Sequence, residues 1–201
     1  GTAPIDPAAE ARTLENYQRL ARIFAAMKPE EAAPVLSQLD DAQLEGILMA
    51  MQGRNAAPIL AALDARGWSL DEVWITHHHS DHVPGAAAYA EEGATIVTFR
   101  ENEAVVRKAA GDDAVRLQFV EDRMTLTDGQ RTVELYNIGP TPHAENILIA
   151  HLPGEGIIFE ADHFPQPASG VIPPAVPATI AFAEALERLG LEFTRLVGAH
   201  S

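Results

Sequence analysis

The chain of 201 residues contains no cysteine. Disulfides, iron–sulfur clusters, thiolate zinc sites and cysteine nucleophiles are therefore all excluded. A chain of this length buries roughly 70% of its unfolded surface, so it needs no disulfides in order to fold. Any metal site in this protein has to be built from its 8 histidines and its carboxylates.

Basic residues are scarce as well. Lys and Arg total 14 against 29 Asp and Glu, which gives a formal net charge of −15 at pH 7. This balance argues against a nucleic-acid partner, because a phosphate-binding surface needs clustered Lys and Arg. No run of about 18 uncharged apolar residues occurs, so neither a membrane span nor a membrane partner is predicted. The first residues show no signal peptide, which favours a soluble cytoplasmic protein. They also lack Met, which leaves a periplasmic location open.

The first 64 residues lack any strand-like run and are predicted to be helical. Ala, Leu, Glu and Gln dominate this segment, and all four favour helix. Apolar side chains recur at three- and four-residue steps from Leu14 to Phe24, which predicts one amphipathic helix. Asp6 followed by Pro7 is typical of a cap and a first helical turn.

An internal repeat follows this first helix. Residues 27–40 align with residues 51–64 at an offset of 24, and 7 of these 14 positions are identical. Short amphipathic helices of this kind must stack in order to bury their apolar faces. The repeat is similar to those of the magnesium-transporter intracellular N-domain and the flagellar chaperone MotE, which implies a small right-handed superhelix over residues 14–64. A generic helical cap or an oligomerisation arm is the alternative.

Strands and helices alternate after residue 65. Strands are predicted over 73–76, 94–99, 132–137, 147–152, 156–161 and 196–197, and helices over 84–92, 101–110 and 178–189. This order indicates a mixed α/β fold of the layered α+β kind. We therefore expect two parts, a helical repeat segment at 1–64 and a metal-binding α/β domain at 65–201.

The most informative segment is Thr76–His82, which follows the first of these strands and reads THHHSDH. Residues two apart face the same side of an extended backbone, so His77 and His79 are placed to face one ion. The turn that follows brings Asp81 and His82 to a second position. Packing these groups together would be costly without a cation. They are ligands that zinc, iron and manganese accept.

Three later residues lie at predicted strand ends, where α/β folds gather their active-site loops: His143, Asp162 and His200. With the first motif they resemble the metallo-β-lactamase-fold hydrolases, over about residues 58–201. The hallmark of that superfamily is HxHxDH after a strand, then a distant His, an Asp that closes a strand, and a last His.

The resemblance implies a site for two divalent metal ions, with zinc favoured and iron or manganese as alternatives. By this likeness His77, His79 and His143 would hold one ion, Asp81, His82 and His200 the other, and Asp162 would bridge them. His78, His151 and His163 have no place in the pattern and are interpreted as ordinary surface or core histidines. For His163, which directly follows Asp162, a place in the lining of the cleft is the alternative.

The implied reaction is hydrolysis by a metal-bound hydroxide. Asp81 is the expected catalytic residue, because its free carboxylate oxygen could orient the nucleophile and take up its proton. The commonest zinc β-lactamases use a Cys in the second site, and the all-His/Asp set is more similar to glyoxalase II, lactonases and phosphodiesterases. The acidity of the chain disfavours RNA and DNA, so a small ester, thioester, lactone or lactam is the predicted substrate.

The resemblance ends before the first motif. Members of the superfamily begin with several strands, whereas helical repeats stand in that place here. The implied fold is thus an αββα sandwich that lacks its usual N-terminal strands. We interpret the chain as a chimera of a helical piece and a hydrolase piece. A natural divergent member, or a homodimer that completes the sheet, is the alternative. The alternative function is a helical binding or assembly module fused to a metal-binding hydrolase remnant of weak or no activity.

Overall fold

The computed structural model describes residues 7–40, 66–111, 113–164 and 174–199, together with residues 43, 44, 47, 60, 63, 64 and 172. No helix in these ranges combines the length and the apolar character that crossing a membrane would require.

The N-terminal part contains two helices, α1 (Pro7–Ala26) and α2 (Pro29–Leu36). Proline opens α1, as predicted, because its missing N–H costs nothing in a first helical turn. Phe24 of α1 and Leu36 of α2 lie in one buried cluster with Leu44 and Ile47. Most of the second repeat copy, and the cap residue Asp6, lie outside the described residues. The repeat resemblance therefore stays a prediction.

Two sheets follow. The first has the order β1-β2-β3 and is parallel, with strands β1 (Glu72–Trp74), β2 (Thr95–Thr98) and β3 (Leu117–Phe119). The second has the order β4-β5-β6-β7-β8, with strands β4 (Arg123–Thr127), β5 (Thr132–Asn137), β6 (Leu148–Leu152), β7 (Ile157–Glu160) and β8 (Arg195–Gly198). Its pairs are antiparallel except β7 with β8, which is parallel.

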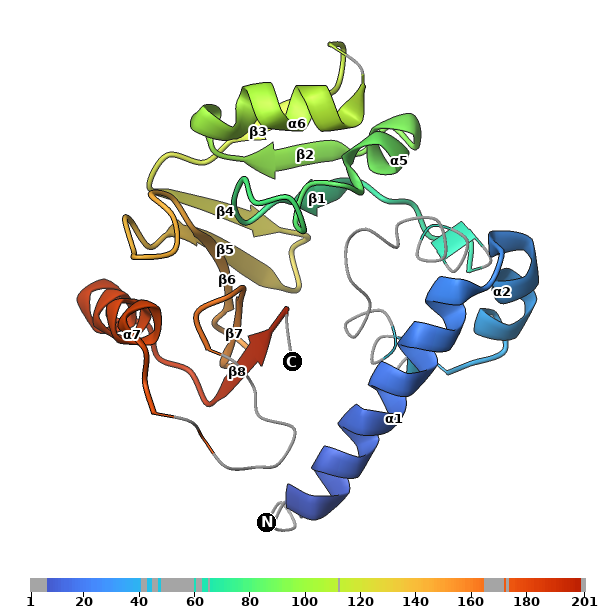
Figure 1. Ribbon diagram of the computed structural model, residues 1–201, viewed down its shortest axis with the longest axis horizontal. Helices are drawn as coiled ribbons and strands as arrows, with labels where there is room; N and C mark the ends of the chain where they lie inside the picture. The colour runs from blue at the N-terminus through green and yellow to red at the C-terminus, as the bar shows by residue number, and fades with distance from the viewer. Residues whose placement is uncertain are drawn as a thin grey trace.

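Helices cover both outer faces of the paired sheets, so the layers run α, β, β, α (Figure 1). On the first sheet lie α5 (Ala86–Glu91), the short 3₁₀ helix η2 (Arg100–Asn102) and α6 (Glu103–Ala110), with Val106 and Ile96 in their shared core. Phe99, Leu135 and Leu148 fill the space between the sheets. On the second sheet lies α7 (Pro177–Leu189). The predicted layered α/β class is confirmed.

Strands β3 and β4 were absent from the sequence-based prediction. The strand β3 has three residues, too few to establish a period. Strand β4 does alternate, with Met124 and Leu126 packed against the core between the sheets and its other side chains exposed. This period-two pattern could have revealed it. Among the described residues before Glu72 no strand occurs, in line with the expected lack of N-terminal strands.

Several strand ends meet at one edge of the sandwich. The antiparallel register places the end of β5 beside the start of β6, and the ends of β7 and β8 at the same edge. The first sheet joins them there, because the Thr76 carbonyl after β1 accepts a hydrogen bond of 2.9 Å from the Leu148 amide. The segments that follow these strands are thereby brought together.

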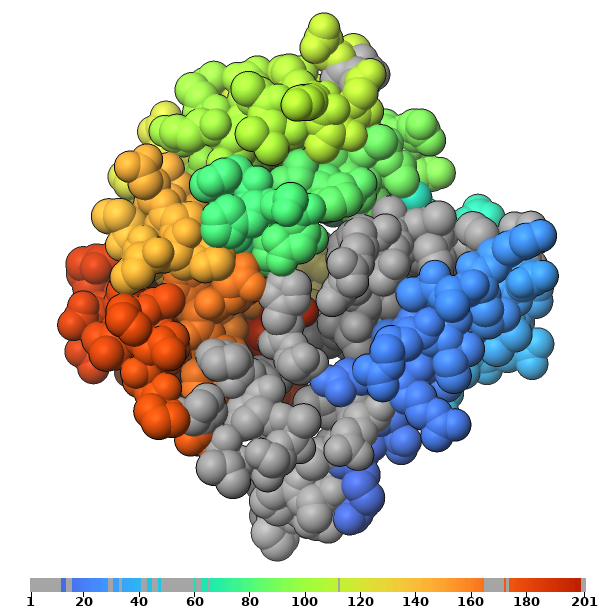
Figure 2. Space-filling view, viewed as in Figure 1, coloured from blue at the N-terminus to red at the C-terminus, as the bar shows by residue number. Residues whose placement is uncertain are grey.

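Figure 2 shows the outer surface of the sandwich, from green to red, on one side, and that of α1, in blue, on the other.

Candidate metal centre

The candidate centre is built around His77, which is fully buried just after β1. Its Nε2 atom lies 3.0 Å from Nδ1 of His79 and 3.0 Å from Nε2 of His143. A carboxylate oxygen of Asp162, Oδ2, is 3.2 Å from the same atom. His143 comes from the segment between β5 and β6, and Asp162 follows β7, so three strand ends supply these four side chains.

Two overlapping groups of side chains converge closely enough to hold a metal ion. The first is His77, His79 and His143, and the second is His77, His82 and Asp162; within each group the ligand atoms lie within 4.8 Å of one another. The Oδ2 atom of Asp162 is 2.8 Å from Nε2 of His82 and 3.3 Å from Nε2 of His143. This carboxylate, a member of the second group, therefore also lies next to His143 of the first group.

The donor chemistry of the cluster fits a divalent transition metal. A neutral imidazole has one donor and one acceptor nitrogen, so a single hydrogen on Nε2 of His77 cannot satisfy three close neighbours. Burial, and next the neighbouring His82, lower the pKa of His77 to about 3, which leaves a lone pair free at neutral pH. Burial also lowers the pKa of His79. A zinc-like ion accepts lone pairs from such a His and carboxylate set.

Asp162 adopts a left-handed backbone, with a φ of 68°, and it is the one described residue other than glycine with positive φ. The side chain of Glu160, almost fully buried, supports this turn by accepting a 2.9 Å hydrogen bond from the His163 amide. Burial raises the pKa of Glu160 to about 7. The strained backbone of Asp162 and the supporting carboxylate of Glu160 therefore both lie at the end of β7, next to the histidine cluster.

Hydroxyl groups support the histidines from behind. Thr76 Oγ1 lies 3.1 Å from Nδ1 of His77 and 3.4 Å from Nδ1 of His82, on the side of each ring opposite to the cluster. Thr141 Oγ1 accepts a 3.1 Å hydrogen bond from the His143 amide. Sequence reasoning assigned neither threonine a role. Thr76 could have been noticed, because it directly precedes the histidine motif.

The remaining predicted ligands lie elsewhere or outside the described residues. Asp81 belongs to neither group of converging ligands; its side chain is 51% exposed, and Oδ2 lies 3.5 Å from Nε2 of His82. His200 lies outside the described residues, two positions after β8. His78 is exposed. His163, interpreted as an ordinary histidine, is fully buried next to Asp162.

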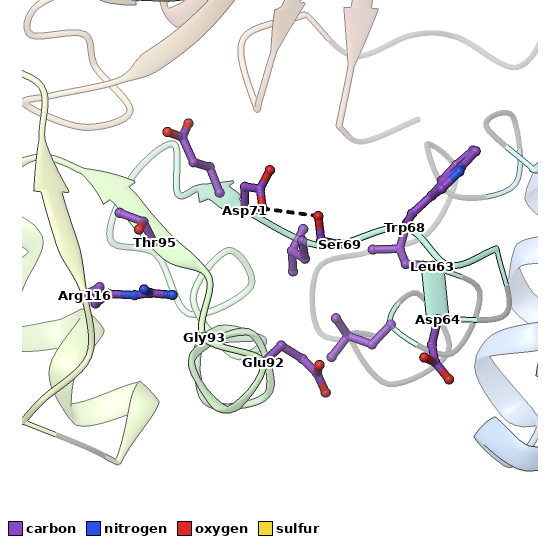
Figure 3. Close-up of a pocket in the computed structure, with 12 residues that line it drawn as sticks. Leu63, Asp64, Trp68, Ser69, Asp71, Glu92, Gly93, Thr95 and Arg116 are labelled. Atoms are coloured by element: carbon purple, nitrogen blue, oxygen red, sulfur yellow. Dashed lines mark hydrogen bonds between the residues drawn. The ribbon is translucent and has the colours of Figure 1, made fainter. Parts of the chain in front are cut away.

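A hollow of about 550 Å³ lies at the opposite end of the first sheet (Figure 3). Its lining includes Asp71 and Glu72 at the start of β1, Thr95 at the start of β2, and Arg116 just before β3. The candidate ligands follow the other end of β1, so this hollow is separate from the candidate metal centre.

The fold and the cluster define a class of protein, an αββα sandwich with a His/Asp site suited to transition metals at one edge. The metallo-β-lactamase superfamily matches residues 40–200, and the chain belongs to that family. It is 36% identical over 107 residues to the hydroxyacylglutathione hydrolase of Ruegeria pomeroyi, which covers 49% of this chain and 36% of that protein. The corresponding enzyme of Erythrobacter litoralis is 31% identical over 99 residues, with the same two shares.

Solved structures show the same fold. The metallo-β-lactamase FIM-1 from Pseudomonas aeruginosa, in its mono-zinc form, matches with a TM-score of 0.54 and 16% identity, covering 73% of this chain and 66% of that one. The flavodiiron protein from Giardia intestinalis matches with a TM-score of 0.54 and 19% identity, covering 73% of this chain and 41% of that one. The chain spans about a third of the length of the curated relatives it matches.

Proposed function

We propose that the protein is a dinuclear metal-dependent hydrolase that acts on a thioester or on a related small ester, lactone or lactam. The observation that carries the proposal is the convergence of His77, His79 and His143 on one point, with Asp162 between this group and His82. The named activity of the hydroxyacylglutathione hydrolase relatives favours a thioester. Because the chain matches only about a third of the length of these relatives, we propose the type of bond that is hydrolysed and not the thiol compound that carries the acyl group.

The chain's own residues divide the work. His77, His79 and His143 would hold one ion, His82 and His200 the other, and Asp162 would bridge them. The resemblance implies Asp81 as a further ligand of the second ion, but Asp81 belongs to neither converging group and is left out of this set. Bound divalent metal would polarise the carbonyl oxygen of the substrate and lower the pKa of an attacking water. Asp81, which is exposed and lies 3.5 Å from His82, would orient that water and accept its proton.

The test combines metal analysis with a substrate panel. Purified protein should contain zinc, iron or manganese, and after reconstitution with each metal it should be offered lactoylglutathione, nitrocefin, a homoserine lactone and a nitrophenyl phosphodiester. Turnover of the thioester should exceed that of the phosphodiester. Wild-type protein that binds no transition metal at neutral pH would exclude the proposal.

Two neighbouring histidines provide a matched pair of variants. His79 belongs to a converging group and His78, one residue earlier, is exposed and belongs to neither group. His79→Ala should lose metal and activity together, whereas His78→Ala should keep both. Asp81→Asn should keep bound metal and lower kcat, which separates a catalytic carboxylate from a ligand.

A second candidate is a metal-binding module of low activity, joined to helices that bind a partner. One observation favours it. Among the described residues, no strand pairs with the outer edge of β1, the strand that leads into His77. A site on loops needs rigid support within about 0.5 Å to catalyse well. Stoichiometric metal with no turnover of any substrate in the panel would favour this candidate.

A further inference from the structure

His163 is a buried histidine that belongs to neither group of converging ligands. It directly follows Asp162, and its ring packs 5.7 Å from the ring of Phe182 in α7. Both of its ring nitrogens have partners: Nδ1 lies 2.7 Å from the Ala161 carbonyl oxygen, and Nε2 lies 3.0 Å from Thr141 Oγ1. A buried ring with two short hydrogen bonds is held in a single orientation.

The direction of these hydrogen bonds follows from proton counting. A carbonyl oxygen can only accept, so Nδ1 of His163 carries the hydrogen and donates it to Ala161. In a neutral ring Nε2 is then an acceptor, and the Thr141 hydroxyl donates to it. The lone pairs of that hydroxyl face the amides of His143, at 3.1 Å, and Ala144, at 3.4 Å.

His163 therefore connects three parts of the fold. Its ring acts through Thr141 on the segment that carries His143. Its amide donates to Glu160 at the end of β7. Its carbonyl accepts a 2.6 Å hydrogen bond from Thr179 in the first turn of α7.

We propose that His163 is a positioning residue that acts through Thr141 to fix the backbone of His143 relative to Asp162. The two cluster atoms whose spacing it sets are Nε2 of His143 and Oδ2 of Asp162, which are 3.3 Å apart. The importance of that spacing rests on the metal centre of the proposed function. The hydrogen-bonded connection itself consists of protein groups alone.

The first test measures amide hydrogen exchange in metal-free protein. Thr141→Val removes the hydroxyl and should speed exchange of the His143 and Ala144 amides at least tenfold. His163→Phe should have the same effect on the His143 amide, although His163 does not touch that amide. Thr141→Ser and His163→Gln, which keep a hydroxyl and an acceptor, should restore protection to within about threefold of wild type. Unchanged exchange of the His143 amide in His163→Phe would overturn the proposal, whatever Thr141→Val does.

The second test measures cobalt(II) affinity and the visible spectrum of the bound ion. Outer partners of metal ligands commonly change affinity by about 10–100-fold, so Thr141→Val and His163→Phe should each weaken binding by that amount and shift the spectrum. The double variant should lose no more cobalt affinity than the single variant that binds cobalt more weakly, because both changes break the same connection. Additive losses, or an unshifted spectrum at unchanged affinity, would overturn the proposal.

The two proposals can fail separately. Wild-type protein that binds no metal would end the proposed hydrolase, and the exchange measurement would still decide the positioning role. Wild-type protein that binds metal while both variants bind it equally well would end the positioning role alone. Thr141 is only partly buried, so Thr141→Val should fold and tests the contact of the hydroxyl with the His143 amide. Where His163→Phe fails to fold, His163→Leu tests the role of the ring in its place.

Discussion

Replacing Thr76 with valine should weaken metal binding while leaving the metal-free fold almost unchanged. Thr76 is buried, and its hydroxyl lies beside Nδ1 of both His77 and His82. When the Nε2 atoms of these rings bind a cation, each Nδ1 must carry the hydrogen, and the threonine oxygen accepts it. Without metal, the hydrogen of His77 can move to Nε2, where the Asp162 carboxylate is 3.2 Å away.

The magnitude follows from the two contacts. A buried donor that loses its acceptor costs about 1–3 kcal/mol. The 3.1 Å contact with His77 should contribute most, since a contact of 3.4 Å, as with His82, is weak. Because the cost falls on the metal-bound form, it appears as a loss of affinity of about 10–100-fold, which corresponds to about 1.4–2.7 kcal/mol. The metal-free protein should lose less than this, because the hydrogen of His77 can then pair with Asp162 through Nε2, and only the contact between Nδ1 and the threonine hydroxyl is lost.

Chelator competition gives the affinity, and urea unfolding in EDTA gives the stability of the metal-free form. Thr76→Ser keeps the hydroxyl and should bind metal within about threefold of wild type. The reasoning would be refuted by a Val variant that binds zinc as tightly as wild type. It would also be refuted if the unfolding free energy without metal fell as much as the binding free energy.

Three further predictions follow from single residues. Asp162→Asn should fold, because asparagine tolerates positive φ, but atomic emission analysis should show that it has lost most of its metal. Asp162→Ala should lose the metal as well, and its unfolding free energy should fall by about 1–2 kcal/mol, because alanine does not tolerate this backbone conformation. In metal-free protein the pKa of His77 is about 3, against 6.5 when unfolded, so the unfolded chain binds the extra proton between these values. His77 should therefore lower the unfolding free energy by up to about 1.4 kcal/mol per pH unit on acidification from pH 6.5 to 3. Glu160, with its pKa raised from 4.5 to about 7, has the opposite effect above pH 4.5, so the net fall should appear between pH 4.5 and 3, and urea titrations of His77→Gln should show a flatter slope there. Leu135→Ala, fully buried between the sheets, should cost about 2–5 kcal/mol in urea unfolding, whereas an exposed site such as Val105→Ala should change stability by less than about 0.5 kcal/mol.

The sequence allowed prediction of those features that depend on local backbone geometry. His77 and His79 share one side of an extended segment, and the structure places their ring nitrogens 3.0 Å apart. His143 and Asp162 were expected near them because each follows a strand. The exposure of Asp81 could not be predicted, because it depends on the turn that follows His79. Hydrophobic periodicity identifies helices and strands, but it does not predict the conformation of a turn.

Features that depend on distant partners escaped prediction. Thr141 and His163, for example, are separated by 22 residues. A threonine in a Pro-rich turn and a histidine near a strand end are common in any sequence, so the sequence alone does not indicate that these two residues make contact. Only the packing of α7 and the second sheet against the same loop brings them into contact. The helical segment shows the same limit: composition predicted α1 and α2, while their packing partners could not be read from propensity.

The backbone at Asp162 shows why a strand end can supply a ligand that alternation alone would misplace. In β7, Ile158 faces α7 and Phe159 faces the space between the sheets. A continued strand would place residue 162 on the same face as residues 158 and 160, away from the histidines. The left-handed φ of 68° ends the strand there, and the carboxylate instead meets three imidazoles at 2.8–3.3 Å. Such a conformation costs about 1–2 kcal/mol for a residue with a side chain. The conformation persists because Glu160 holds the chain on both sides. The Glu160 carboxylate accepts a hydrogen bond from the His163 amide, and the Glu160 carbonyl accepts one from the amide of Ala199, just after β8. An aspartate here therefore serves two needs at once, since it tolerates the turn and brings a carboxylate oxygen into the histidine cluster.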